Sequence, residues 1–323
     1  MLSVEQLNSL REIDWKNPIK LILINSREKE LFLKFEEFCN QLTEAVHHLS
    51  LEYGEETLIG YPAIKLDNIY YLALPIDEWW PPFFAAIKTI ATGKTELREN
   101  NYKTLRKITS PLNIKVMASK APSLFLWAAN FSNQAAILNS LIKTYIIDID
   151  LYPKIKKRYQ ITATPTVIID EDYILVEKEV KNITNWIAKA SKKIYDSMVF
   201  KSLLKEARAK RVIELCLKKG EIPDALLNLL LDLELSSRVG TMVVLEEISK
   251  ISPSLTQNII PKLLSMLELP DKRDRGDALY VLGLIGTSEI IPILKDTASK
   301  ETEELEEIAL EAIENIKNRT IMH

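Results

Sequence analysis

In the first third of the chain, short runs of apolar residues alternate with segments in which apolar residues recur at the spacing of a helix. Residues 17–25 (NPIKLILIN) form an apolar run after a turn signal, short enough to be a buried strand. From about Arg27 to Leu49 the apolar residues recur on one face of a helix. Two short strands and a closing helix follow, at 61–66 (YPAIKL), 68–75 (NIYYLALP) and about Pro82 to Ala91. The predicted order for this first unit, residues 1–109, is β-α-β-β-α.

The same order recurs in a second unit, which we place at residues 110–195. Its predicted elements are a strand, a long apolar helix, a strand, a short helix, two hairpin strands and a closing helix: 112–119, 121–141, 143–150, 152–159, 165–170, 173–180 and 182–194. Two copies in tandem make an internal repeat with a spacing of about 100 residues. Only 12 positions separate Ser50 from Pro62, whereas 25 separate Ser140 from Pro165. We therefore expect a strand and a helix to be missing from the first unit, so that its sheet is reduced.

After the second unit, residues 196–323 show a purely helical spacing of apolar residues. Segment 237–250 (SRVGTMVVLEEISK) aligns with 274–287 (DRGDALYVLGLIGT), which places Arg238 over Arg275. A third copy, LEEIALEAIENIK, lies further on, and a second apolar helix follows each of the first two copies. Stacked helix pairs at this spacing form an α-solenoid, because no pair can bury its apolar face alone.

Composition and charge argue against several classes of protein. With 42 Lys and Arg against 45 Asp and Glu, the net charge of −3 gives no general attraction to nucleic acid or to an anionic membrane, so we expect neither partner. No apolar run is long enough to span a bilayer, and the N-terminal MLSVEQLNSLREIDW lacks the pattern of a signal sequence. Two cysteines give no disulfide framework and favour a cytoplasmic location. Scarce glycine, 8 residues in all, together with abundant Lys, Glu and Ile is typical of a thermophilic protein.

The segment from Asn17 to Ile194 resembles the archaeal protein disulfide oxidoreductases, which consist of two thioredoxin-like units in tandem. The resemblance rests on NPIKLILIN, on YYLALP in a predicted hairpin, on the linker GKTEL and on two candidate cis-prolines, in Tyr61-Pro62 and Thr164-Pro165. The rest of the chain resembles HEAT repeats, most visibly in DRGDALYVLGLIGTSEIIPILKD. The expected fold class is α/β plus all-α: two tandem thioredoxin-like units, the first reduced, followed by an α-solenoid of HEAT-like helix pairs.

The chain departs from the oxidoreductase family where each unit should have a CxxC motif, at the start of its first long helix. Glu30-Leu31-Phe32-Leu33 occupies this place in the first unit, and Pro122-Ser123-Leu124-Phe125 occupies it in the second. Thiol–disulfide exchange needs an attacking thiolate and a resolving thiol close by. The sequence therefore excludes this reaction at both places, and we expect no catalytic residue and no cofactor.

The resemblance also implies a peptide-binding face beside each candidate cis-proline. In thioredoxin-like folds the backbone before this proline pairs with an extended substrate, and here that backbone belongs to Tyr61 and Thr164. With Pro122, Leu124 and Phe125 in place of the redox turn, the groove would be apolar and could still hold a peptide. The alternative is that the prolines only shape their hairpins, and that packing residues fill the place of the cysteines.

The aromatic segment 79–84 (WWPPFF) has two interpretations. Its side chains could pack the helix that Pro82 begins, or Trp79 and Trp80 could form an exposed anchor for a partner.

Other reactive residues are few. Cys39 and Cys216 lie on predicted helices, and we interpret both as small buried hydrophobic residues; a lone redox-active thiol at Cys39 is the alternative. His47 and His48 are adjacent, so they would diverge on a helix instead of sharing a metal ion. No Cys, His or carboxylate cluster has the spacing of metal ligands, so we expect no metal site.

Charge is uneven along the helical region. Residues 192–219 hold nine Lys or Arg against three acids, whereas 301–314 hold seven Glu and no base. Patches of opposite sign suit protein partners or head-to-tail self-association. We therefore interpret the chain as a non-catalytic interaction protein, or adaptor, that binds a protein partner through its HEAT-like face. The alternatives are a holdase-type chaperone that binds extended peptides and an enzyme that uses Cys39 or an unrecognised site.

Overall fold

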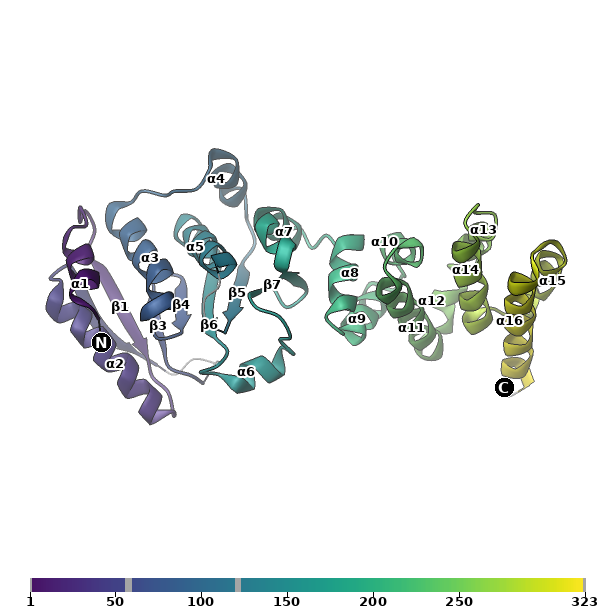
Figure 1. Ribbon diagram of the computed structural model, residues 1–323, viewed down its shortest axis with the longest axis horizontal. Coiled ribbons are helices and arrows are strands. Elements are labelled where there is room, and N and C mark those ends of the chain that lie inside the picture. The colour runs from purple at the N-terminus through teal and green to yellow at the C-terminus, as the bar shows by residue number, and fades with distance from the viewer. Residues whose placement is uncertain (1, 56–59, 120–122, 322–323) are drawn as a thin grey trace. The chain divides into compact units, whose positions relative to one another are not determined.

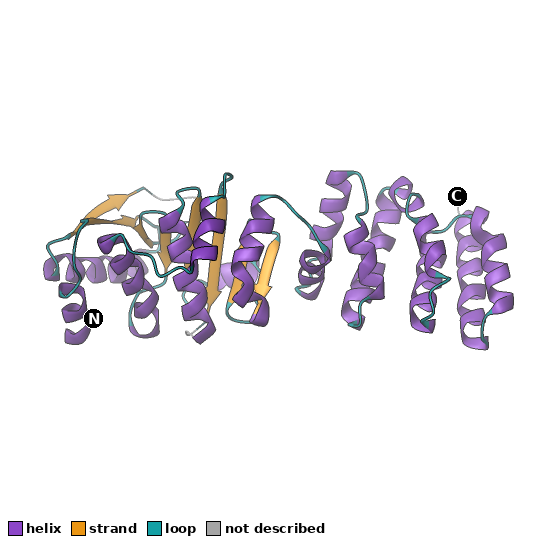
Figure 2. Ribbon diagram, turned by 90° about the horizontal axis from the view of Figure 1, so that it is seen from above, coloured by secondary structure: helices purple, strands orange, loops and turns teal. Residues whose placement is uncertain are grey.

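The computed structural model describes residues 2–55, 60–119 and 123–321. The chain divides into two compact units, Met1–Ile194 and Tyr195–His323. The first combines a mixed sheet with helices, whereas the described residues of the second form helices and their connections (Figures 1 and 2). Within the described ranges, no helix is both long and apolar enough to cross a membrane.

One sheet runs through the described part of the first unit, in the strand order β2-β1-β3-β4-β6-β5-β7-β8. Figure 1 labels the strands from β1 to β7 within it, apart from β2. Its strands are β1 (Ile19–Ile24), β2 (Leu49–Gly54), β3 (Ala63–Leu66), β4 (Ile69–Leu72), β5 (Leu112–Ala118), β6 (Ile142–Asp148), β7 (Thr166–Ile169) and β8 (Tyr173–Val176). Each sequence repeat supplies four neighbouring strands, and β4 joins the two repeats because it pairs in parallel with β6. The two halves therefore share one sheet.

The helices of the first unit are α1 (Val4–Arg11), α2 (Lys29–Ala45), α3 (Trp80–Thr92), α4 (Glu99–Arg106), α5 (Ser123–Leu138), α6 (Pro153–Arg158) and α7 (Ile183–Ser191). Tyr71 of β4 shows how two of them cover the core face of the sheet. Its ring lies edge-on against Phe83 of α3 at 4.9 Å, and its hydroxyl accepts a hydrogen bond of 2.6 Å from Asn133 Nδ2 of α5. All elements predicted for the second repeat are present.

The strand that we expected to be missing from the first half is present, so that prediction was wrong. Helix α2 ends at Ala45 and Val46 has extended backbone, so Leu49–Gly54 is free to form β2 in parallel with β1. This strand lies at the edge of the sheet and most of its side chains meet solvent. An edge strand of this kind lacks the apolar run that marked the other strands. The connection from β2 to β3 contains no helix in its described residues.

The two candidate cis-prolines differ. The peptide bond of Thr164-Pro165 is cis, as predicted, whereas among the described residues Tyr61-Pro62 is not cis, so the second prediction was wrong. Contacts of a different kind hold this second loop. The Tyr152 hydroxyl donates to the Pro62 carbonyl at 2.9 Å, and the rings of Tyr61 and Tyr152 pack with centroids 4.8 Å apart.

The second unit consists of helices that pack in sequence order. They are α8 (Ser197–Lys205), α9 (Ala209–Lys219), α10 (Asp224–Leu227), α11 (Leu235–Ile251), α12 (Pro253–Gln257), α13 (Ile260–Met266), α14 (Lys272–Ile285), α15 (Ile291–Lys300) and α16 (Glu303–Ile321). Helix α11 contacts α14, and α14 contacts α16, so the three segments that the sequence aligns as copies are spatial neighbours. Gly283 permits the second approach, because a Cβ atom there would lie 2.9 Å from the Ala312 Cα atom.

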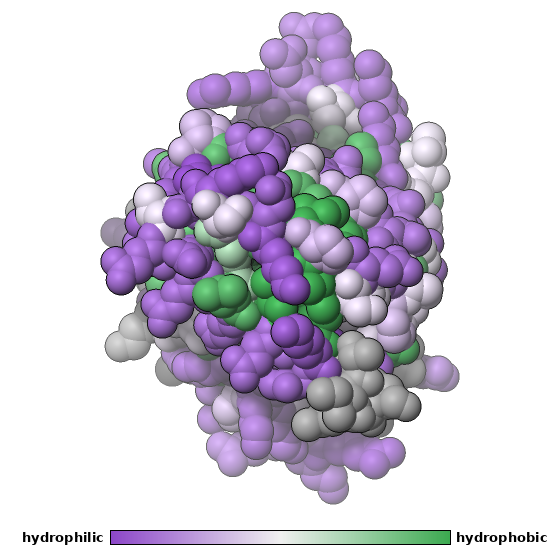
Figure 3. All heavy atoms as spheres, turned by 90° about the vertical axis from the view of Figure 1, so that its right-hand side faces the viewer, coloured by the Kyte–Doolittle hydropathy of each residue, from purple (hydrophilic) through white to green (hydrophobic). Residues whose placement is uncertain are grey.

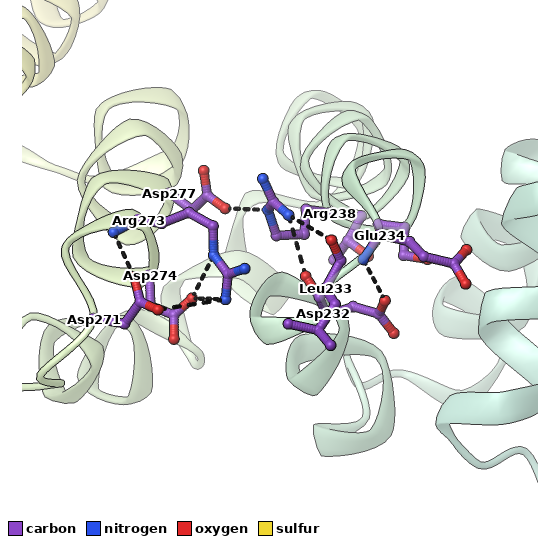
Figure 4. A network of polar contacts seen from close by, with 10 residues as sticks. Asp232, Leu233, Glu234, Arg238, Asp271, Arg273, Asp274 and Asp277 are labelled. Carbon is purple, nitrogen blue, oxygen red and sulfur yellow. Dashed lines mark hydrogen bonds and ion pairs between the residues drawn. The ribbon is translucent and has the colours of Figure 1, made fainter.

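The two arginines that the sequence aligns make equivalent contacts. Arg238 Nη1 donates to the carbonyls of Asp232 and Leu233 at 3.2 and 3.4 Å, and its Nε donates to Asp277 Oδ2 at 2.7 Å (Figure 4). Arg275 Nη1 donates to the carbonyls of Leu269 and Pro270 at 3.0 and 3.1 Å, and its Nε donates to Glu301 Oε1 at 2.6 Å. Each arginine thus joins the segment before its own helix to an acid of the next repeat.

Candidate functional site

A groove of about 600 Å³ lies on the helical unit between α11, α14 and α16, and we call it the α11–α16 groove. Its residues come from the three aligned copies: Val239, Met242, Val243 and Glu246 of α11; Lys272, Arg273, Gly276, Asp277, Tyr280 and Leu284 of α14; Glu304, Leu305, Ile308 and Glu311 of α16. Because each helix packs on the next, the groove has walls of regular structure, which hold its side chains in place.

Apolar side chains are exposed along this groove. Val239 and Val243 are each 45% exposed and Tyr280 is 47% exposed. Leu235, one turn before Val239, continues the same row along α11 and is also exposed. The core of the unit takes other faces of α11, including Leu245 and its buried neighbours, so this row has no partner within the described residues of the unit. An apolar row of this kind is typical of a binding surface.

Gly276 shapes the floor of the groove. A Cβ atom at this position would lie 3.3 Å from Leu305 Cδ2 and 3.6 Å from Ile308 Cδ1. Any larger side chain would therefore extend into the space between α14 and α16. The absence of a side chain at residue 276 helps to keep the groove open.

Most charges along the groove are engaged in ion pairs, several of them with residues outside it. Four carboxylates line it, from Glu246, Asp277, Glu304 and Glu311, against two cations. Lys272 pairs with Glu304, Glu246 pairs with Lys250, and Arg273 lies 2.7 Å from Asp274. Figure 4 shows Arg273 directed toward Asp271 and Asp274, while Asp277 faces Arg238. A ligand in the groove would therefore meet an apolar row with mostly paired charges beside it.

A second apolar patch lies at the C-terminal end of the helical unit. Ile293 of α15 and Leu310 of α16 are exposed there. Viewed from that side, apolar atoms gather in the middle of a largely hydrophilic surface (Figure 3). Apolar side chains that are exposed on a hydrophilic surface are typical of a contact with another protein. Self-association through this end stays a prediction.

The structure corrects the interpretation of Trp79 and Trp80 as an exposed anchor. Their side chains are only 6% and 8% exposed. The Trp79 ring lies edge-on against Phe125 of α5 with centroids 4.6 Å apart, and Trp80 stacks on Phe84 at 5.7 Å. The segment WWPPFF thus packs the start of α3 into the core.

The residues predicted for a peptide groove do not form one open surface. Phe125 and Pro165 are buried, Leu124 is half-buried and Thr164 is exposed; Pro122 lies outside the described residues. In the other loop, Tyr61 is half-buried and Pro62 is buried. Phe125 in particular is fully buried against Trp79.

The cysteines are poorly suited to thiol chemistry. Cys39 is fully buried, and burial, together with the nearby Glu36 carboxylate, raises the pKa of its thiol to about 12. Burial likewise raises the pKa of the Cys216 thiol to about 11, although Lys219 lowers it in part. Thiolate, the reactive form, is therefore scarce at neutral pH at both positions.

We expect neither cysteine of the native protein to be modified by a thiol reagent at neutral pH during a period in which the denatured protein reacts completely. Counting labelled thiols by mass spectrometry, before and after adding denaturant, measures this. A Cys216→Ser variant isolates Cys39 in the same experiment. Rapid labelling of Cys39 in that folded variant would contradict the buried, protonated thiol described above.

Comparison with known proteins supports the fold of the first unit. No family model matches the chain, and no curated protein matches it. Among solved structures, a protein disulfide oxidoreductase from Aeropyrum pernix K1 is 15% identical, covers 58% of this chain and 91% of its own, and superimposes with a TM-score of 0.50. The first unit has a thioredoxin-like fold. A domain of the alkylhydroperoxide reductase AhpF from Enterococcus faecalis is 14% identical over 56% of this chain and 95% of its own, with a TM-score of 0.48.

The groove residues were not identified as a site from the sequence, although a signal was present. Leu235, Val239 and Val243 recur every four residues on α11, while Leu245 and Ile248 mark the core on another side. A helix that is apolar on two sides has one more face than its own unit needs to bury. The alignment of 237–250 with 274–287 does not separate these two faces.

Proposed function

We propose that this protein is a non-catalytic interaction protein in which a HEAT-like helical unit binds a protein partner in the α11–α16 groove. The observation that supports this most directly is the exposed row of Val239, Val243 and Tyr280 beside a groove of about 600 Å³. Apolar patches rimmed by charged residues are typical of sites where another protein docks.

The partner segment that suits this groove is an amphipathic helix with apolar residues one turn apart and basic residues beside them. Val239 and Val243 are themselves one turn apart, so they can pack against such a row. A basic flank on the partner would meet the carboxylate of Glu311, whereas Glu246 already pairs with Lys250.

In this proposal the thioredoxin-like unit has a role without dithiol exchange. The places that correspond to the family's CxxC motifs contain Glu30 to Leu33 and Pro122 to Phe125, with no cysteine in either. Exchange without a thiolate and a resolving thiol has no chemical route. In this proposal the thioredoxin-like unit has a structural role and no catalytic one.

The test is a capture experiment with the full chain immobilised. Extract of the source organism is passed over the wild type, over a Val239→Glu/Val243→Glu variant and over Ile251→Glu. Ile251 is the matched control, because it is 58% exposed on the same helix but does not line the groove. We expect one or two stoichiometric partners on the wild type and the control, and at least a roughly tenfold loss on the groove variant, because two buried charges replace two apolar contacts.

Other outcomes would favour the other functions. A heterogeneous set of unfolded proteins, with suppression of aggregation by the wild type, would favour a holdase. Equal capture by all three forms would place the partner outside the groove. If no protein binds specifically in repeated trials, the interaction function fails and an enzymatic role becomes the better hypothesis.

A further inference from the structure

One face of the sheet of the first unit carries a row of four polar or aromatic side chains among apolar ones. The strand registers place Lys65 opposite Tyr70, Tyr70 opposite Tyr145, and Tyr145 opposite Lys115, across β3, β4, β6 and β5. Successive residues of a strand point to opposite faces, so these four share one face. Their neighbours on the other face are fully buried: Ile64, Tyr71, Ile146 and Val116.

The side chains of this row contact one another. The rings of Tyr70 and Tyr145 stack with centroids 4.9 Å apart, and Lys65 Nζ lies 5.6 Å from the centre of the Tyr70 ring. Burial raises the pKa of the Tyr145 phenol, so its hydroxyl keeps its proton and can donate a hydrogen bond.

Helix α6 and the residue after it cover part of this face. The Tyr159 ring lies 5.4 Å from Lys115 Nζ, and the Tyr159 hydroxyl donates to Glu171 Oε1 at 3.1 Å. Between α6 and strands β4, β5 and β6 a cavity of about 470 Å³ remains. A volume of this size is typical of small-molecule sites. Nothing in the proposed binding of a protein partner uses this cavity.

Three cations line the cavity. They are Lys115 of β5 and Lys154 and Arg158 of α6, and no carboxylate among the described residues lines it. Lys115 is paired with Glu171 from outside the cavity. Lys154 and Arg158 are one helical turn apart, and the Arg158 guanidinium lies 5.5 Å from the centre of the Tyr159 ring. Within the described residues neither of these two cations has a carboxylate partner, so both can bind an anionic ligand.

Apolar and aromatic residues line the rest of the cavity. They include Leu72 and Ile147 of the sheet, Ile155 of α6, and Tyr61. A ligand for this site therefore needs an anionic group joined to a flat or apolar body. A phosphate monoester has a charge of about −1.5 to −2 at neutral pH, which matches two cations better than a single carboxylate does.

We propose that this cavity binds a small organic phosphate, such as a nucleoside monophosphate, with its phosphate on Lys154 and Arg158 and its body between Tyr61 and the aliphatic wall. A ligand of this size needs only local positive charge, so the overall net charge of −3 does not oppose it.

The experiment is calorimetric titration of the full chain with AMP, with inorganic phosphate and with adenosine. Two double variants give a matched comparison. Lys154→Gln/Arg158→Gln removes the two cations that line the cavity, and Lys156→Gln/Lys157→Gln removes the same charge from exposed positions of the same helix that do not line it. All four side chains are exposed, so both variants should keep the unfolding temperature of the wild type without ligand.

We expect the wild type to bind AMP, to bind inorganic phosphate more weakly and to bind adenosine more weakly still. The Lys154→Gln/Arg158→Gln variant should lose at least roughly tenfold in affinity for AMP, since each lost bond to phosphate is charge-assisted. The Lys156→Gln/Lys157→Gln variant should bind AMP within about twofold of the wild type. The proposal is overturned if neither AMP nor phosphate binds, or if both variants lose affinity equally. Equal loss, with tighter binding of a single-stranded oligonucleotide, would indicate a general basic patch on α6.

Discussion

Trp79→Ala is expected to lower the free energy of unfolding of the thioredoxin-like unit by about 3–5 kcal/mol. Its side chain is 6% exposed and lies against Phe125, so its removal leaves a large cavity between α3 and α5. All tryptophans of the chain, Trp15, Trp79, Trp80, Trp127 and Trp186, belong to residues 1–194. Denaturant unfolding followed by tryptophan fluorescence therefore measures this unit alone.

Trp127→Ala is the matched control for this prediction. Trp127 is 40% exposed, although it stacks on Phe131 with centroids 5.5 Å apart, so its removal forms a smaller cavity and costs clearly less. An unchanged transition in Trp79→Ala, combined with loss of a captured partner, would show instead that Trp79 is an anchor for that partner.

Arg238→Ala is expected to destabilise the helical unit by about 3–5 kcal/mol. The substitution removes the bond to Asp277 and both bonds to the carbonyls of Asp232 and Leu233, in a place where the Arg238 side chain is 10% exposed. The helical unit contains no tryptophan, so tryptophan fluorescence does not report its unfolding. Far-UV circular dichroism reports both units, and the change in its transition that fluorescence does not show measures the helical unit. Lys250→Ala on the same helix, whose ion pairs are exposed, should cost clearly less than Arg238→Ala.

The carboxyl group of Asp277 gives this prediction a pH dependence. Burial already raises the pKa of Asp277, against the opposing effect of the Arg238 guanidinium, and removal of that guanidinium raises it further. A carboxyl whose pKa is raised in the folded state stabilises it below the unfolded pKa, and this stabilisation is lost as the pH rises through the folded pKa. The effect of Arg238→Ala should therefore be largest at neutral pH and smaller in acid.

A double-mutant cycle completes the test. Asp277→Asn removes the charge that Arg238→Ala leaves unpaired, so the double variant should lose less stability than the sum of the two single variants. Strictly additive losses would show that Arg238 acts through the carbonyls of Asp232 and Leu233 alone.

Residue patterns predicted the first unit well where both faces of a strand or one face of a helix are buried. The run 19–24 and the hairpin strands β7 and β8 are apolar because core surrounds them, and the sequence identifies all three. The last of them ends at Val176, because residues 177–182 form a short 3-10 helix where the sequence predicted strand up to residue 180. The cis bond at Pro165 followed from the resemblance to the oxidoreductases. Patterns of this kind are reliable because burial dictates the residue type.

Elements and side chains that depend on tertiary neighbours were missed. Strand β2 has solvent on most of its surface, so its pairing with β1 decides its structure. Helix α4 is short and polar, with one fully buried residue, Leu105, and was not predicted. The burial of Trp79 depends on Phe125, which is 46 residues away in the chain. The cavity at α6 needs residues from three strands that only the register brings together.

The parallel pairing of β4 with β6 gives a physical reason for the chain to retain both thioredoxin-like repeats. If each repeat formed its own sheet, one repeat could be deleted without changing the edge strands of the other. Here β4 of the first repeat pairs with β6 of the second, so neither strand is an edge strand. In a chain without the first repeat, the backbone N–H and C=O groups of β6 would be unpaired and could pair with a strand of another molecule. Solubility alone thus favours retention of both copies, whether or not either one performs a reaction.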